Sequence, residues 1–370
     1  MKTVVIQICI VLAVLFSAIN AESVDFQEEI RRLAEDNARG YIGPFATAFG
    51  TGMNSGFYHT AKPHKVLGFD INVRVALMQV AKEDLEYDFY FPKVPFPLTH
   101  PINNQVDTLV INLQDFYPDR KTSTVFGSNP ANELTPDITI LDEVILQAME
   151  NAGWDSLAIE LLLDSPIYDE FKNNIAKNIR TFTSVPGIGL DYFPFVMPQV
   201  SVGLPMKTEV MLRFMPEIEL TDIGKVKFTG IGVKHSISQY IPIPMFPVDI
   251  TAQFVWQKLE IGELIESTHI GYNLHASKRV GLPLLSITPY VGFGVESSDL
   301  KLAYTIENKL NPFGEEVDLE GTEVKFDLKG DNKTRLTMGA RLGFTLFTIS
   351  AEYSVGAYNV LTVGAGLTLR

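Results

Sequence analysis

The residues of this chain that could perform chemistry lie on short stretches of alternating polarity. His269 and His275 share one side of such a stretch with Ser267 and Asn273. A histidine that activates a serine is the pair used in nucleophilic acyl transfer. Positions six apart on a strand are roughly 20 Å apart, because a strand rises about 3.3 Å per residue. We therefore interpret these side chains as a polar lining and expect no enzymatic activity.

A second group contains Gly56, Tyr58 and His59. His59 could contact a ligand or gate a passage, or it could be a rim histidine that hydrogen-bonds to the backbone of a turn. The sequence has no phosphate-binding loop, dinucleotide fingerprint or zinc-binding His-x-x-x-His helix. Its only cysteine, Cys9, precedes the expected cleavage point, so the mature chain has no thiolate and no disulfide. We expect no cofactor and no metal site.

The first residues are typical of a secretory signal. Lys2 precedes an apolar run over residues 4–16, and Ala21 offers a small residue for cleavage. The run is too short for a membrane anchor, which needs roughly 20 apolar residues. The formal net charge of the whole chain is −14, and loss of residues 1–21 with Lys2 makes it −15. So acidic a chain is a poor nucleic-acid binder, and we expect no nucleic-acid partner.

Strands must position these polar residues. In residues 69–78 every second side chain is apolar, and between them stand Asp70, Asn72 and Arg74. The pattern returns from Lys207 to Arg370, in strands long enough to cross a bilayer when tilted. One face is large and apolar, and the other carries charges, amides and glycines. This is the signature of a barrel with lipid outside and water inside, and we expect an all-β, antiparallel, up-and-down transmembrane barrel of about 12–14 strands as one domain over residues 41–370.

The alternation also predicts which way each side chain faces. The expected lumen-lining residues are Asp70, Asn72, Arg74, Glu209, Arg213, Asp249, Gln253, His269, Asn273, His275, Arg341 and Glu352. The expected lipid-facing residues include Ile250, Phe254, Trp256, Ile270, Leu274, Leu342, Val363 and Leu367. A tight hairpin centred on Leu346 and Phe347 would place Arg341 directly opposite Glu352.

Two segments have helical rather than strand periodicity. Val24–Ala38 predicts a short amphipathic helix that ends before Gly40, and residues 22–40 are expected to pack as a periplasmic helix on the barrel mouth. Residues 142–182 predict a helical insertion, with helices over Asp142–Asn151 and Tyr168–Phe182. This insertion is either a plug over a pore or an ordered excursion outside the membrane.

Two blocks carry a family resemblance: NSGFYHTAK at residues 54–62, and SVGLP at 201–205 followed by RFMP at 213–216 and GVKHSI at 232–237. They resemble an uncharacterised family of bacterial outer-membrane barrels of the Bacteroidetes type, over nearly the whole mature chain. The resemblance implies a barrel and a location but no activity. Asn129-Pro130-Ala131 resembles the hatch of outer-membrane long-chain fatty acid transporters, although here it follows several strands.

These observations predict a signal-exported outer-membrane barrel of a Gram-negative bacterium. The expected function is porin-like passive passage or binding of a small molecule, hydrophobic ones included. The alternatives are a non-conducting structural or assembly barrel, and a soluble exported β-sheet protein that binds lipid. The expected partners are outer-membrane lipid, the barrel assembly machinery during insertion, and a small-molecule ligand.

Overall fold

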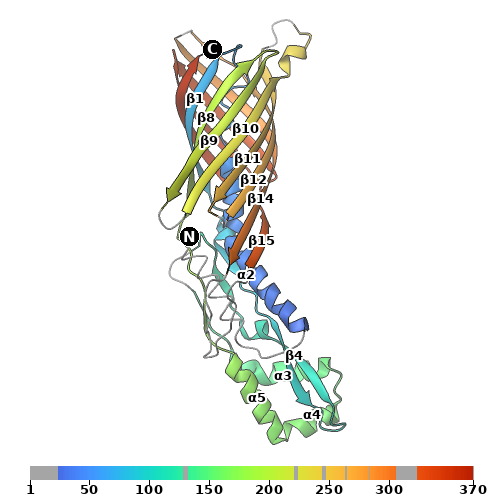
Figure 1. Ribbon diagram of the computed structural model, residues 1–370. Coiled ribbons are helices and arrows are strands. Elements are labelled where there is room, and N and C mark those ends of the chain that lie inside the picture. The colour runs from blue at the N-terminus through green and yellow to red at the C-terminus, as the bar shows by residue number, and fades with distance from the viewer. Residues whose placement is uncertain are drawn as a thin grey trace.

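The computed structural model describes residues 24–127, 132–220, 224–243, 247–262, 265–282, 284–305 and 323–369. The expected signal segment and the Asn129-Pro130-Ala131 tripeptide lie outside these ranges. A barrel forms one end of the molecule and a smaller unit of helices and strands the other, and a long helix joins them (Figure 1). No helix within the described ranges combines the length and apolarity needed to cross a membrane.

Within the described residues, ten antiparallel strands close the barrel, and β1 pairs with β18 to complete it. In chain order they are β1 (Phe69–Gln79), β8 (Tyr192–Leu204), β9 (Thr208–Leu220), β10 (Gly224–Ser236), β11 (Asp249–Ile261), β12 (Ile265–Ser277), β14 (Leu285–Thr305), β16 (Thr334–Phe344), β17 (Phe347–Val355) and β18 (Asn359–Leu369). Two short strands, β13 (Val280–Gly281) and β15 (Glu323–Lys329), pair only with β14. The barrel confirms the predicted fold class. The expected 12–14 strands were too many, because strand-like segments before residue 191 form separate small sheets.

Burial alternates along the barrel strands as a membrane barrel requires. On β1 the apolar Phe69, Ile71 and Val73 are exposed outward, whereas Asp70 and Arg74 are buried inside. Because the side-chain period of a strand is two, one such assignment fixes the face of every other residue on that strand.

The hairpin between β16 and β17 corrects the predicted register. Phe344 pairs with Phe347 across a two-residue turn, in which Thr345 has a φ of 53°. Tight hairpins need this left-handed conformation at the first turn position, and Thr345 supplies it. The centre therefore lies one residue earlier than expected, so Arg341 faces Ser350 instead of Glu352. This moves the pairing by two positions and leaves both faces unchanged.

The N-terminal helix is much longer than the sequence indicated. Helix α2 spans Val24–Met53, so the expected end before Gly40 and the expected strand start at Tyr41 were both wrong. Gly40 lies inside the helix, where a Cβ would stand 2.2 Å from a ring carbon of Tyr87. Tertiary contacts outweigh the low helix propensity of such residues. The helix runs from the smaller unit into the barrel (Figure 1).

Residues 81–191 form a mixed unit outside the barrel wall. Its elements are 3₁₀ turns at Lys82–Leu85, Leu113–Phe116 and Ile138–Ile140; strands β2 (Glu86–Asp88), β3 (Lys93–Thr99), β4 (Val106–Asn112), β5 (Lys121–Ser123), β6 (Glu133–Leu134) and β7 (Phe182–Thr183); and helices α3 (Leu141–Asn151), α4 (Ser156–Leu163) and α5 (Pro166–Asn178). The predicted helical excursion is confirmed, although α4 was not foreseen and α5 ends before Phe182. The unit has its own apolar core, which includes Phe89, Ile111 and Ile145. The barrel wall therefore does not include this unit, and the end of α2 lies inside the barrel instead of in its wall.

Two polar contacts hold α5 against α3. The Asp142 carboxylate accepts hydrogen bonds from Lys172 Nζ and from the Tyr168 hydroxyl, both at 2.6 Å. The hydrogen bond from Lys172, and then that from Tyr168, holds the pKa of Asp142 below its ordinary value.

Candidate functional site

The barrel interior is filled by the chain's own residues 41–64, which we name the plug. It consists of the last turns of α2 and the segment that leads toward β1. In the half of the barrel nearer the mixed unit, the wall turns apolar side chains inward against it. Tyr41, Phe49 and Met53 of the plug join one buried cluster with wall residues such as Phe228 and Leu300. Burial of this apolar area anchors the helix at that level.

Where helix α2 ends, polar residues of the barrel wall form hydrogen bonds to the plug. The last turn of α2 has no basic residue of its own, and its terminal carbonyl groups need donors. Arg213, which is fully buried, donates from Nη1 to the Met53 carbonyl and from Nη2 to the Ser55 carbonyl, both at 2.8 Å. Its guanidinium also lies 3.6 Å above the Phe57 ring. The wall thus supplies the positive charge that a helix C-terminus favours.

A second arginine acts at the same level. Arg335 Nη2 donates to the Thr51 carbonyl at 2.7 Å, and its Nη1 donates to the Ser55 hydroxyl. Glu296 accepts from Arg335 Nε and Nη2 at 3.0 and 2.9 Å, a paired geometry that fixes the guanidinium plane. On the neighbouring strand β17, the Glu352 carboxylate accepts a hydrogen bond from the Gly56 backbone N–H at 3.0 Å. Gly56 has a φ of 68°, a conformation that favours glycine.

Two histidines of the plug continue the network toward the C-terminal end of the barrel. His59 pairs with Arg74 and lies 3.5 Å from the Asp70 carboxylate. His64 presents both its backbone N–H and its Nδ1 to Glu209, at 2.9 and 2.8 Å.

The Glu209 carboxylate is shared between plug and wall. Its second oxygen lies 2.9 Å from Lys234 Nζ, and both side chains are almost fully buried. Removing one partner from such a buried pair leaves an uncompensated charge. The plug is therefore held by specific polar contacts as well as by apolar packing.

The expected lumen-lining residues lie on the inward sides of their strands, in three different situations. Contacts to the plug come from Asp70, Arg74, Glu209, Arg213, Glu352 and His275, the last through a ring stack on Tyr58 at 4.0 Å. Asn72 donates to Asp70 and accepts from Arg74, and Asn273 donates to Gln253. Asp249 is half-exposed at the first position of β11, and Arg341 is buried. The two ring nitrogens of His269 lie within hydrogen-bond distance of Ser267 and Ser298.

The residues that sequence reasoning missed include four charged or histidine side chains of this network: His64, Lys234, Glu296 and Arg335. The three wall residues could have been predicted, because each lies an even number of positions from another lumen-facing residue on its strand. Arg335, for example, is six positions from Arg341 on β16. His64 carried no such signal, since it lies in a turn whose path the sequence does not define.

The serine–histidine set lies closer together than the sequence argument assumed. His269 Nε2 is 2.8 Å from the Ser267 hydroxyl, and its Nδ1 is 2.9 Å from the Ser298 hydroxyl. His269 and His275 are six positions apart, but Ser267 is only two positions from His269 and lies on the same side of β12. Helix α2 covers this group, because a Cβ on Gly50 would stand 2.2 Å from the Ser298 hydroxyl oxygen. The helix backbone at Gly50 therefore lies directly against the Ser298 side of this group.

Helix α2, whose last turns belong to the plug, is also bound to the mixed unit. Asn37 of α2 and the backbone of Tyr90 exchange two hydrogen bonds, at 2.9 and 2.8 Å. The Val125 N–H donates to the Tyr41 carbonyl at 2.9 Å, and the Tyr41 hydroxyl donates to the Pro186 carbonyl at 2.9 Å. One helix therefore contacts both the lumen and the mixed unit.

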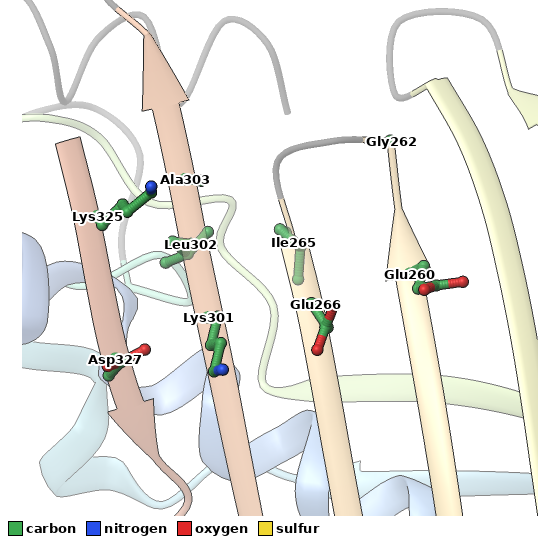
Figure 2. A pocket seen from close by; sticks show the side chains of 9 residues that line it. All are labelled: Glu260, Gly262, Ile265, Glu266, Lys301, Leu302, Ala303, Lys325 and Asp327. Atoms are coloured by element: carbon green, nitrogen blue, oxygen red, sulfur yellow. The ribbon is translucent and has the colours of Figure 1, made fainter. Parts of the chain in front are cut away.

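Near the mixed unit, the outer wall of the barrel carries charged side chains in addition to apolar ones. A groove of about 300 Å³ crosses β11, β12, β14 and β15, and its lining includes the charged residues Glu260, Glu266, Lys301, Lys325 and Asp327 (Figure 2). Charged side chains on an outward face are incompatible with the middle of a bilayer. The lipid-facing band therefore ends before this level, and the barrel protrudes from the membrane toward the mixed unit. Among the described residues, no group of three or more His, Cys, Asp or Glu side chains could hold a metal ion.

A closed antiparallel barrel with an apolar outer band and a polar interior defines a transmembrane barrel of the outer-membrane type. The chain belongs to a family of unknown function, DUF6588, which it matches over residues 1–369. The search of curated proteins found no match. The family match agrees with the expectation of an uncharacterised family and adds no activity.

Two solved structures are similar in outline. The loop L8 deletion mutant of OmpT, an outer membrane protein of Vibrio cholerae, is 9% identical and aligns over 82% of this chain and 100% of its own, with a TM-score of 0.23. In-vitro folded OmpT from Vibrio cholerae is 10% identical over 81% of this chain and 98% of its own, also with a TM-score of 0.23. The expectation that the chain is not an enzyme is withdrawn. At this level of similarity the two OmpT structures assign no activity in its place.

Proposed function

We propose that the protein is a bacterial outer-membrane barrel, exported by its signal segment, that holds its lumen closed and anchors the mixed unit at the membrane surface. The observation that carries this proposal is the plug. Residues 41–64 occupy the interior and are bound there by buried wall residues, Arg213, Arg335 and Glu209 foremost. Of the functions expected from the sequence, the non-conducting barrel fits this arrangement best. Outer-membrane lipid and the barrel assembly machinery remain its expected partners.

Loop lengths support an orientation. In bacterial barrels the periplasmic turns are short and the outer loops are long. The end that carries the C-terminus has tight connections at residues 205–207 and 345–346, and its longest connection is residues 237–248 between β10 and β11, which is far shorter than the insertion of residues 81–191 at the other end. The other end carries the mixed unit and the start of α2 (Figure 1). The mixed unit and the beginning of α2 would then lie outside the cell, which replaces the expected periplasmic position of that helix.

Cysteine labelling tests the orientation cleanly, since the mature chain contains no cysteine. Asp169→Cys would place a thiol on the exposed side of α5, and Met206→Cys, 75% exposed, would place one in the turn at the opposite end. We expect a membrane-impermeant maleimide to label Asp169→Cys on intact cells, and Met206→Cys only after the outer membrane is permeabilised. The reverse result would contradict the orientation.

Conductance tests the closure. Wild-type protein in a planar bilayer should show no steady ion current, whereas a variant that lacks residues 24–64 should conduct if it still forms the barrel. Far-UV circular dichroism is the control for the strands. A steady current through the wild-type barrel would refute the closed state.

A second candidate, gated passage of a small molecule, is favoured by one observation. In the half of the barrel nearer the C-terminus, wall and plug meet through hydrogen bonds and ion pairs, which water can replace more readily than it replaces apolar packing. The expected lumen-lining residues would then line a path opened by movement of the plug. Brief current steps that become frequent when a plug contact is removed would favour this candidate.

A further inference from the structure

The hairpin of β3 and β4 in the mixed unit is a sheet of only two strands, so each strand has one outer edge. Backbone hydrogen bonds identify the residues that face each edge. His100 N donates to Gln105 O at 2.7 Å, so these two residues form a hydrogen-bonded pair. Such pairs alternate with pairs whose N–H and C=O groups point away from the partner strand. The residues that point outward are therefore Pro95 and Pro97 on β3, and Thr108 and Val110 on β4.

The two edges differ in how they are protected. Pro95 and Pro97 have no N–H, so the edge of β3 cannot serve as a regular template for another strand. Directly across the hairpin, Thr108 and Val110 keep their N–H groups. Within the described part of the chain, no partner takes up the outward backbone groups of these two residues. Proteins usually protect exposed strand edges, and here one edge is blocked and the other is left open.

The open edge of β4 faces a groove rather than bulk surface. Two adjoining hollows of about 380 and 350 Å³ lie between β4 and α3. The strand contributes Thr108, Val110 and Asn112. Helix α3 contributes Ala148 and Asn151, Ala152 follows at its C-terminal cap, and Lys93 of β3 also lines the larger hollow. Two alanines four positions apart lie on one helix face and leave room beside the strand. Val110 is 52% exposed.

We propose that this groove binds an extended peptide segment of another protein, which adds to β4 as a third strand. Main-chain hydrogen bonds to an open edge are a common way to recognise peptides. The proposal deepens the proposed function, because it names a partner for the mixed unit that the barrel anchors.

The groove also indicates the chemistry of the peptide. Asp115 and Glu143 line one hollow, and Asp115 lines the other together with Lys93. The two carboxylates outnumber the one cation, so a Lys or Arg beside the paired stretch is complementary in charge. Thr108 and Val110 favour β-branched residues opposite them, since such cross-strand pairs pack well. The segment that fits best is therefore extended, rich in Val and Thr, and basic at its ends.

The test uses the full mature chain in detergent micelles and a fluorescein-labelled nine-residue probe that alternates Thr and Val between terminal lysines. We expect saturable binding in fluorescence anisotropy. Val110→Pro removes one outward N–H, and Ala152→Tyr fills the groove from the helix side; each should weaken binding at least about tenfold. Pro95→Val is the matched control on the opposite edge and should leave the affinity unchanged.

A second probe, N-methylated at every central amide, keeps the side chains and charges but loses its donors, and it should not bind. Equal binding of both probes, or wild-type affinity in Ala152→Tyr, overturns the proposal even if Val110→Pro misfolds. Absence of probe binding overturns it too, as does self-association of the protein that Val110→Pro abolishes. These measurements depend neither on orientation nor on conductance, so their failure leaves the proposed function standing.

Discussion

Replacing Arg213 by alanine should release the plug. In the closed state its guanidinium donates to two plug carbonyl groups, those of Met53 and Ser55, at 2.8 Å each. A hydrogen bond to a charged group contributes about 1.5–3 kcal/mol, so loss of two should weaken plug docking by roughly 3–6 kcal/mol. Because each 1.4 kcal/mol is about tenfold in an equilibrium constant, the released population should rise roughly 10²- to 10⁴-fold.

A buried thiol can report that release. Thr362 is 2% exposed and faces the plug, where its Cγ2 lies 3.0 Å from the position of a Cβ on Gly56. In a Thr362→Cys background, a water-soluble maleimide should react only when the plug leaves the lumen. When opening and closing are fast, the labelling rate follows the open population. We expect Arg213→Ala to accelerate labelling by the same two to four orders of magnitude.

The control is Arg180→Ala, which removes an exposed arginine of the mixed unit far from the lumen. It should leave the labelling rate at the wild-type value. If Arg213→Ala also labelled at that rate, while circular dichroism showed intact strands, the arginine would not hold the plug and the reasoning would fail.

Three further outcomes are expected. Lipids brominated on their acyl chains should quench Trp256 on the outer wall but not Trp154, which is 6% exposed inside the mixed unit; quenching that survives in Trp256→Phe would contradict this. Phe254→Arg should lower the free energy of unfolding in a urea titration by about 2–4 kcal/mol. The control Thr268→Arg, beside the charged end of the wall, should lower it by about 0–1 kcal/mol. Equal costs would argue against a position of Phe254 deeper in the bilayer than that of Thr268. Because hydrogen bonds hold the pKa of Asp142 below its ordinary value of 3.8, its stabilisation of the mixed unit is present above that pH and is lost as pH falls through the lower folded value. Asp142→Asn should remove this acid sensitivity from the Trp154 fluorescence, and an unchanged acid profile would count against the assignment.

The alternation of residue types was enough to predict a transmembrane barrel, because each strand by itself has apolar side chains on its lipid-facing side and polar side chains on its lumen-facing side. It could not give the number of strands. Residues 106–113 have a pattern that suits a strand in any sheet, and only tertiary contacts decide that β4 pairs with β3 outside the barrel.

The plug was beyond local reasoning for a related reason. Gly43, Pro44, Gly50 and Gly52 usually mark breaks in a helix, yet α2 continues through all of them. Two of these glycines allow the helix to approach the wall closely: a Cβ on Gly50 would collide with Ser298, and one on Gly52 would stand 2.7 Å from Met78 Cε. The alternation along each strand predicted which polar side chains face the lumen. It could not predict which plug residues they contact, because those contacts depend on the path of that helix.

The pairing of β1 with β18 has a consequence for the order of biogenesis. Phe69 pairs with Leu369, so the seam joins the first strand of the barrel to the last. Until β18 is in place the sheet is an open ribbon with two unsatisfied borders, which need temporary protection. Residues 41–64 lie shortly before β1 in the chain, so this segment is already attached to the leading strand when the ribbon closes. Closure of the ribbon around this segment, with the seam sealed last, would enclose the helix without threading it through a finished cylinder.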